Sequence, residues 1–190
     1  MMDKRERIFK ATEELLATQG FHGISMSLVA KEAGVAAGTI YRYFSDKDDL
    51  LRQLHLHVSL RARDAVFEGV SPDATPFEQY RQIWLNAFRL LSTDTFCLRC
   101  KAQYESSPNF EQMELDPENQ QIWLRLQHFF EEGVRQGLFI ALPHRILSAL
   151  SLDSVMHIAQ LDRLAGHALS EAEREEAVRA SWRAILKPQS

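Results

Sequence analysis

The chain has 190 residues, of which 45% are hydrophobic and 25% charged, and its formal net charge is −4. These are the values of an ordinary globular protein that buries a sizeable core as one or two domains. No uncharged apolar run reaches the roughly 18 residues of a membrane span, no secretory signal opens the chain, and two cysteines make no disulfide framework. We therefore expect a cytoplasmic protein without a membrane partner.

The acidic excess lies in the second part of the chain. Residues 1–68 hold ten basic and ten acidic residues, whereas residues 69–190 hold 12 and 16. Basic residues crowd the N-terminus between Lys4 and Lys10, and Arg42 and Lys47 mark a second basic spot. A local basic surface is what phosphate contact requires, so the net charge does not exclude a nucleic-acid partner. The N-terminal cluster fits equally a solvated helix start and a contact with a flanking minor groove.

Scarce glycine and proline and the lack of strand-like alternation predict an all-α fold. The first part predicts helices over residues 4–18, from Ser25 to Gly34, over about 37–44, and from Ser45 to near Gly69. Ser25 is a good N-cap, and Ser45 with Asp48 three residues later resembles a capping box.

Residues 71–76, which read SPDATP, are the clearest linker. Beyond them we expect helices over residues 77–91, 94–105, 117–136, 144–164 and 170–186, with Gly133 inside the third and a capping box of Ser170 and Glu173 before the last. The predicted organisation is a helix-turn-helix domain over residues 1–46 and a helical body over residues 47–190, joined by the long fourth helix.

Residues 25–44 have the pattern of a helix-turn-helix, two helices separated by a three-residue turn. Ala30 is small where the two backbones must approach, and Gly34 tolerates the left-handed conformation that the turn needs. Val29, Val35 and Ile40 fall where inward anchors must lie. The third helix then presents its remaining residues outward, with small ones at its start that let the backbone enter a major groove and hydroxyls and a guanidinium beyond them.

The string AGVAAGTIYRYFSDKDDL, from Ala33 to Leu50, resembles the signature of the TetR family of transcriptional regulators, and the resemblance extends over residues 7–54. It implies an N-terminal three-helix head that binds DNA and a body that dimerises and binds a ligand. By this resemblance Ser25 binds a phosphate, Ser27 stands where some members place a base-reading arginine, and Arg42 reads bases. The positions implied in DNA binding are Ser25, Ser27, Ala37, Gly38, Thr39, Tyr41, Arg42, Tyr43 and Lys47.

Members of the family are most often repressors that leave a palindromic operator when a small molecule binds the body. The resemblance therefore implies operator DNA, a second copy of the chain and a small-molecule effector as partners. We see no arrangement of nucleophile and base, no phosphate loop and no metal-ligand cluster, so we expect neither an enzyme nor a cofactor.

The last two predicted helices are the expected dimer surface. Residues 146–164 are apolar in nearly every direction, which requires cover on more than one side, and a partner subunit is the simplest second cover. The last helix adds an apolar stripe beside Ala177, Ala180 and Ala184, which permit close approach. The predicted interface comprises Leu150, Val155, Ile158, Leu161, Val178, Ser181, Trp182 and Ile185.

Aromatic residues between the head and the dimer helices suggest an apolar cavity for an apolar or aromatic effector. The candidate lining is Trp84, Phe88, Phe96, Tyr104, Trp123, Phe129, Phe130, His157 and Gln160. Any single aromatic here is more often plain core than pocket, and His157 is more often an interior or interface residue than a ligand contact.

Cys97 and Cys100 stand three residues apart near Arg99 and Lys101. Such a pair can be redox-active, which gives an alternative function: a redox or electrophile sensor on the same DNA-binding framework. Without a second ligand pair at metal spacing we do not expect zinc, and we favour two inert, semi-buried cysteines.

Overall fold

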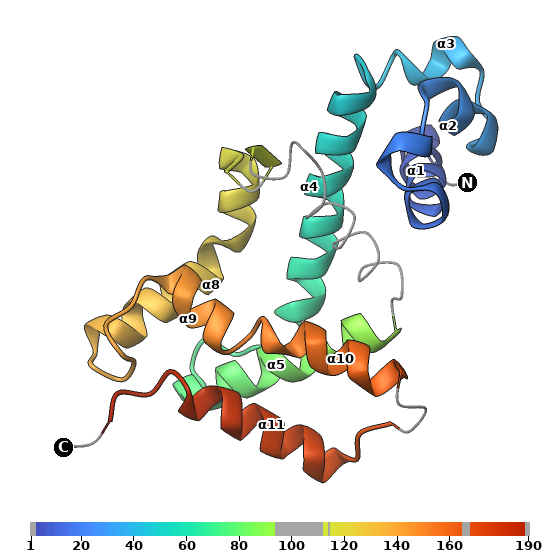
Figure 1. Ribbon diagram of the computed structural model, residues 1–190. Helices are drawn as coiled ribbons and strands as arrows, with labels where there is room; N and C mark the ends of the chain where they lie inside the picture. The colour runs from blue at the N-terminus through green and yellow to red at the C-terminus, as the bar shows by residue number, and fades with distance from the viewer. Residues whose placement is uncertain (1–2, 94–111, 114, 165–167, 189–190) are drawn as a thin grey trace. The chain divides into compact units, whose positions relative to one another are not determined.

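The computed structural model describes residues 3–93, 112–113, 115–164 and 168–188 (Figure 1). Within these ranges the elements are helices, and one isolated antiparallel bridge joins Phe139 to Leu186. Residues 3–59 and those between 112 and 119 form one compact unit, and residues 60–93 and 120–188 form another. No helix in the described part of the chain is both long and apolar enough to cross a bilayer.

The first unit begins with three helices and a single 3-10 turn. They are α1 (Lys4–Gln19), η1 (Phe21–Gly23), α2 (Met26–Glu32) and α3 (Ala37–Ile40). Helix α3 is shorter than predicted, because residues 41–43 continue as a hydrogen-bonded turn. Ser25 caps α2 as expected, since its Oγ accepts the amide of Leu28 at 3.3 Å.

The core of this unit is built from one side of every helix in it. Aromatic packing joins its ends, with the Phe9 and Phe44 rings 5.4 Å apart. Leu50 and Leu54 of α4 (Lys47–Val66) belong to the same core, so the unit continues past residue 46 and takes in most of α4. The fully buried aliphatic residues are Ile8, Leu16, Val29, Ile40, Leu50 and Leu54.

Helix α4 is capped one residue later than its sequence suggests. The amide of Asp49 donates to Oδ1 of Asp46 at 2.8 Å, which makes Asp46 the N-cap. The Asp49 carboxylate in turn accepts the Ser45 amide at 2.9 Å, so the reciprocal contact comes from Asp49 and not from Asp48.

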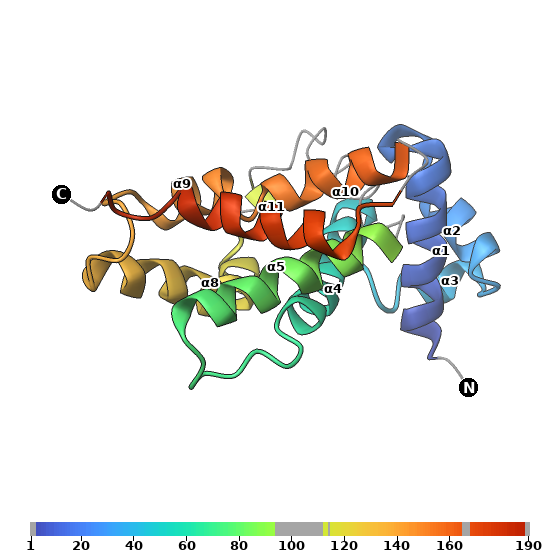
Figure 2. The ribbon, with the colours of Figure 1, turned by 90° about the horizontal axis from the view of Figure 1, so that it is seen from below.

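The second unit is a helical body organised around α5 (Pro76–Thr93). Helices α10 (Ser154–Leu164) and α11 (Glu171–Arg183) both pack along α5, and the three run close together in Figures 1 and 2. The buried hydroxyl of Tyr80 on α5 donates to Oγ of Ser181 on α11 at 2.9 Å. Burial raises the pKa of Tyr80 to about 12. The fully buried residues here include Tyr80, Trp84, Leu147, Ala159, Val178 and Ile185.

The prediction of one helix over residues 144–164 is wrong. The chain forms α9 (His144–Leu150) and α10, separated by residues 151–153. The Ser151 hydroxyl donates to the Leu147 carbonyl at 2.6 Å, and the Ser148 hydroxyl donates to Oδ1 of Asp153 at 3.1 Å. Side chains that bond the local backbone compete with helix propagation, and three serines and an aspartate in seven residues break the helix here.

Helix α8 (Pro117–Arg135) keeps its helical form through Gly133. The ring of Phe139 lies where a Cβ at residue 133 would stand, at 2.1 Å from the nearest ring carbon, so glycine is required by packing. The extended residues after α8 then pair with residues 185–187. The amide of Ile140 donates to the Ile185 carbonyl at 2.9 Å, and that of Lys187 donates to the Leu138 carbonyl at 2.9 Å.

Candidate functional site

The outer face of α3 and of the turn after it carries polar groups on a rigid support. Ala37, Gly38 and Arg42 are exposed, and Thr39 is half-buried. Tyr41 is 59% exposed and Tyr43 36% exposed, although aromatic residues are usually buried.

The support comes from Ile40, which is fully buried on the opposite face of α3. A surface that places two tyrosine hydroxyls, a threonine hydroxyl and a guanidinium side by side suits phosphate oxygens and base edges.

Helix α2 ends in a Schellman motif that sets the angle of α3. The amide of Val35 donates to the Ala30 carbonyl at 2.9 Å, and that of Gly34 to the Lys31 carbonyl at 3.1 Å. Gly34 has φ +61°, the left-handed conformation predicted for it. Ala30 is buried, as its predicted role at the helix contact requires.

Two of the predicted phosphate contacts also have roles inside the fold. The Ser25 hydroxyl caps α2 and lies 3.1 Å from the Ser27 hydroxyl, and both residues are exposed. Lys47 is half-buried, and its ammonium donates to the carbonyl of Phe21 at 2.6 Å. An ammonium has three donors, so two remain for other partners.

The basic N-terminal cluster is divided between the fold and the solvent. The guanidinium of Arg5 donates to Gln53 at 2.9 Å and lies over the Phe9 ring. That of Arg7 donates to the carbonyls of Ala33 and Gly34 at 2.6 and 2.8 Å. Lys4 and Lys10 are exposed.

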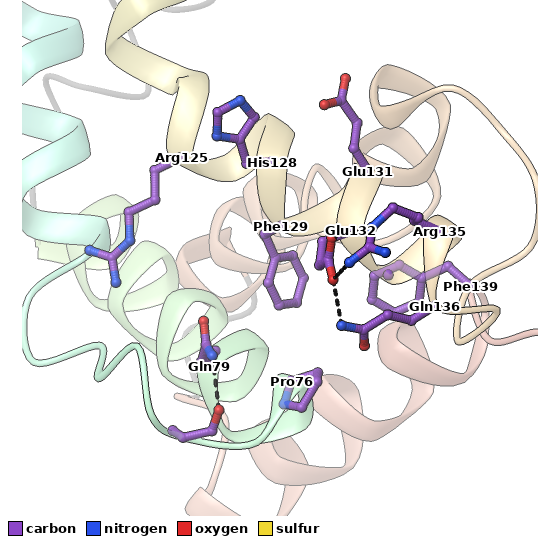
Figure 3. A pocket seen from close by; sticks show the side chains of 12 residues that line it. Pro76, Gln79, Arg125, His128, Phe129, Glu131, Glu132, Arg135, Gln136 and Phe139 are labelled. Atoms are coloured by element: carbon purple, nitrogen blue, oxygen red, sulfur yellow. Dashed lines mark hydrogen bonds and ion pairs between the residues drawn. The ribbon is translucent and has the colours of Figure 1, made fainter.

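The body has an open pocket of about 650 Å³ (Figure 3). It lies between the start of α5, with Pro76 and Gln79, and the second half of α8, and Phe129 and Phe139 form its apolar wall. Two charged groups at its rim, Glu132 and Arg135, are paired with each other. Glu132 accepts from Arg135 and Gln136, and these hydrogen bonds, that of Arg135 first, hold the pKa of Glu132 below its ordinary value.

Arg125, also at the rim, donates to the Val70 carbonyl at 2.9 Å and places its guanidinium 4.4 Å from the centre of the Phe67 ring. Of the residues that line this pocket, only Phe129 was among the aromatics expected from the sequence to line a cavity. Their charged pattern along α8 is that of a solvated helix face, and only the fold brings it opposite Pro76 and Gln79.

The other predicted ligand-binding aromatics lie elsewhere. Trp84 and Phe88 are buried on α5 with their rings stacked 5.6 Å apart, and Phe130 is buried against Phe139. Trp123 is half-buried. None of these four lines the pocket of Figure 3. Phe96, Tyr104, Cys97 and Cys100 lie outside the described residues.

His157 and Gln160 do not face the body core as a cavity lining would require, because both are exposed on α10. The prediction that they line a cavity within one chain is therefore wrong. They share an exposed stretch of α10 with Leu161, which is 64% exposed.

Five of the predicted dimer residues belong to the core of a single chain. Trp182 packs against Tyr80 and Phe139, with ring centres 5.0 and 5.2 Å away, and a side chain so enclosed has little surface to offer a partner. Ile158 is half-buried, and Leu150 and Leu161 are exposed. The predictions that place these buried residues at an interface are wrong: Val155, Val178, Ser181, Trp182 and Ile185.

The apolar stripe of the last helix therefore covers α5 and not a second subunit. The exposed apolar side chains of this part of the body are Ile146, Leu150 and Leu161. Ala180 and Ala184, two of the small residues noted in the sequence, are also exposed. The described residues include no cluster of three or more side chains that could hold a metal ion.

Two protein-family models match the chain. The model described as bacterial regulatory proteins, tetR family, matches residues 8–54, which include α2, α3 and the turn between them. The model described as tetracyclin repressor-like, C-terminal domain, matches residues 76–186, which begin with α5 and include α11.

Known proteins resemble the whole chain. An HTH-type transcriptional regulator of Haemophilus influenzae is 38% identical over 186 residues, 97% of either chain. A solved TetR family regulator from Vibrio parahaemolyticus is also 38% identical and has a TM-score of 0.85 over 98% of this chain and 100% of its own. The regulator FadR from Bacillus subtilis, solved in complex with stearoyl-CoA, shares the fold with a TM-score of 0.74 at 23% identity over 95% and 98% of the two chains.

Proposed function

Since this chain belongs to the TetR family of transcriptional regulators, we propose that it is a ligand-responsive repressor that binds a palindromic operator as a homodimer. The observation that carries this proposal is the exposed polar face of α3. Tyr41 and Tyr43 are exposed without a packing reason, and Arg42 lies between them on a segment anchored by the buried Ile40.

The three side chains have different tasks on DNA. Tyrosine hydroxyls, like those of Ser25 and Thr39, donate to phosphate oxygens, which positions the head without reading sequence. The Arg42 guanidinium can donate to O6 and N7 of one guanine, which reads sequence. Lys47 adds a positive charge, and Ala37 and Gly38 allow the backbone to approach the groove.

The test begins by selecting an operator from a random duplex pool with the purified protein. Affinity is then measured over a range of salt concentrations. We expect Tyr43→Phe to weaken binding to every duplex, because a phosphate contact is lost. Arg42→Ala should reduce the preference for the selected operator over unrelated duplex, and each base contact contributes about 1–3 kcal/mol to that preference. If both variants fold and bind the operator like the wild type, the face of α3 is not the DNA-binding surface.

We propose that the second copy docks on the exposed apolar residues of α9 and α10. Ile146 and Leu150 are 46% and 48% exposed, and Leu161 is 64% exposed. Ala180 of α11 and Ala184 directly after it are small and exposed, which permits a close approach. This surface replaces the buried stripe of α11 as the proposed interface, and it leaves His157 and Gln160 as interface residues.

Leu161→Glu tests the interface without touching the core. A buried, unpaired carboxylate at the centre of an interface costs several kcal/mol, so the variant should be a monomer in light scattering and lose operator affinity. Leu60→Glu is the matched control, because Leu60 is also an exposed leucine but lies on α4, which is not part of the proposed surface, and this variant should remain a dimer. A dimeric Leu161→Glu protein would place the interface elsewhere.

We propose that the effector is a molecule with an apolar body and a hydrogen-bond acceptor, bound along α5. Within the part of the chain that the structure describes, Nε1 of Trp84 is buried and has no hydrogen-bond partner, and the same is true of Oγ of Ser92 two turns further on. A buried donor without a partner costs free energy that a ligand can restore. The stacked ring of Phe88 extends the apolar part of this surface.

The effector test titrates the protein–operator complex with long-chain acyl-CoA esters and with aromatic compounds. Long-chain acyl-CoA belongs in the panel because FadR of B. subtilis, which has this fold, is solved with stearoyl-CoA. Trp84→Phe replaces the indole by a smaller aromatic ring without the N–H donor, so it should weaken the response without changing operator affinity in the absence of ligand. Release by mild oxidant alone, lost in Cys97→Ser, would favour the redox sensor instead.

A further inference from the structure

We infer that Arg7 is a positioning residue for DNA recognition: its guanidinium holds the turn between α2 and α3, and through that turn it sets the direction of α3. The inference rests on the proposed DNA-binding function of α3. Arg7 is one of the basic residues between Lys4 and Lys10, which as a group suit contact with phosphates. The inference gives Arg7 a role inside the fold instead.

The contact is made by one nitrogen that uses both of its hydrogens. Nη2 of Arg7 donates to the carbonyl of Ala33 at 2.6 Å and to that of Gly34 at 2.8 Å. These two carbonyls belong to the turn and not to α2, so the helix itself provides no donor for them. A guanidinium there also suits the negative end of the helix dipole.

The Schellman motif leaves these two carbonyls outside its own hydrogen bonds. Its bonds use the carbonyls of Ala30 and Lys31, which accept from Val35 and Gly34. Arg7 therefore completes the turn from α1, 26 residues earlier in the chain. The fit is close, because a Cβ at Gly34 would stand 2.8 Å from Nη2.

The start of helix α3 depends on this turn. The helix has four residues, and its N-cap, Ala36, makes no side-chain hydrogen bond. Ile40 and Phe44 are buried in the core, but they lie at the C-terminal end of α3 and beyond it, so they leave the direction of its first residues to the turn. The guanidinium fixes a second point, the turn that enters α3, with respect to α1.

A positioning role differs from a phosphate contact in its dependence on salt. Each phosphate contact adds about 0.9 to the slope of log affinity against log salt. With Nη2 of Arg7 committed to the two carbonyls, the guanidinium is held at the turn, and we expect it to add nothing to that slope. Its removal lowers specific binding by misplacing the contacts of α3, and leaves non-specific binding to DNA unchanged.

The experiment compares the full-length wild type with Arg7→Met, and with Lys10→Met as the matched control. Both variants lose one positive charge from α1, but the exposed Lys10 makes no contact with the turn. We expect Arg7→Met to lose about tenfold in affinity for the operator selected from a random duplex pool, about what one base contact contributes. Its salt slope and its affinity for unrelated duplex should equal those of the wild type. Lys10→Met should keep the wild-type ratio of specific to non-specific affinity.

If Arg7→Met fails to fold, Arg7→Lys takes its place, because it keeps the charge and one donor group. It should show a smaller loss of operator affinity, with the salt slope again unchanged. A slope that falls by about one, with equal losses on operator and unrelated duplex, would show that Arg7 binds a phosphate and would overturn the inference. Wild-type binding by both folded Arg7 variants would overturn it too. A wild type that selects no sequence at all would refute the proposed function instead. In that case the contact is still tested by hydrogen exchange of the Val35 amide. This exchange should be faster in Arg7→Met than in the wild type if the guanidinium holds the turn.

Discussion

Gly133→Ala sets helix propensity against packing inside α8. Alanine is about 1 kcal/mol better than glycine in a helix interior, so propensity alone predicts a more stable protein. The new Cβ would stand 2.1 and 2.2 Å from two ring carbons of Phe139, more than 1 Å inside the 3.4 Å at which ordinary contacts begin. The ring cannot turn away freely, because Phe129, Phe130 and Trp182 lie around it with ring centres 5.7, 6.0 and 5.2 Å away.

Forcing an extra methyl group into a packed core costs about 1–3 kcal/mol, and an overlap of this size belongs at the upper end. After the gain in propensity we expect a net loss of about 2 kcal/mol in the free energy of unfolding. For a chain of this length each kcal/mol shifts the melting temperature by about 2–4 °C, so Gly133→Ala should melt about 4–8 °C below the wild type.

The assay is thermal unfolding followed by circular dichroism and by tryptophan fluorescence, which Trp182 makes sensitive to the affected core. Gly38→Ala is the matched control, since Gly38 is helical and has no atom within 4 Å of the added Cβ. It should melt at or slightly above the wild type. In a Phe139→Ala background, Gly133→Ala should no longer destabilise. A single Gly133→Ala variant that melts at or above the wild type would refute the packing argument.

Two further changes test the body. Asn86→Ala should lower the free energy of unfolding in urea by about 2–3 kcal/mol. The reason is that the Asn86 amide donates to the carbonyls of Val66 and Glu68 at the end of α4, and both lose this partner. A loss below about 0.5 kcal/mol would mean that water replaces the amide. Glu175→Gln tests the ion pair with Arg81, whose hydrogen bond holds the pKa of Glu175 below its ordinary 4.5. A carboxyl whose pKa is lowered in the folded state stabilises the fold at pH values above its unfolded pKa. It loses this effect as the pH falls through the folded pKa. The difference in stability between wild type and Glu175→Gln should therefore be present at neutral pH and vanish well below pH 4.5. A difference that does not vary with pH would argue against the pair.

Much of the first unit could be predicted because local chemistry and the fold agree there. Gly34 is left-handed, Ala30 is buried and Ser25 caps α2, and each follows from a requirement within a few residues along the chain. The outward position of Tyr43 and the burial of Phe44 could be predicted as well, whereas Tyr41, which helical spacing also allows as partly core, is 59% exposed.

The body could be predicted only as a set of helices. The apolar stripe of residues 178–185 indicates a buried face, but periodicity does not say whether α5 or a second subunit covers it. Tyr80 decides the matter through its hydrogen bond to Ser181, 101 residues away. The break at Ser151 had a local signal in its serines and aspartate, which the apolar run around them concealed. The pocket had no local signal beyond Phe129, because its two walls come from separate stretches of the sequence, α5 and α8, and its rim charges resemble any solvated helix face.

The antiparallel pairing of residues 138–140 with residues 185–187 has a consequence for synthesis. The head closes on side chains from residues 8–54, with Met113 added later, whereas the body lacks Val178, Trp182 and Ile185 until that late stretch of the chain has been made. Domains fold from the N-terminus as the chain emerges, so a DNA-reading head exists well before the body is closed. A chain that stops short of residue 178 would leave the Phe139 cluster open and its apolar surface available to chaperones and proteases. Because the residues that complete the body core lie so late in the chain, a head without a complete body would be exposed to degradation.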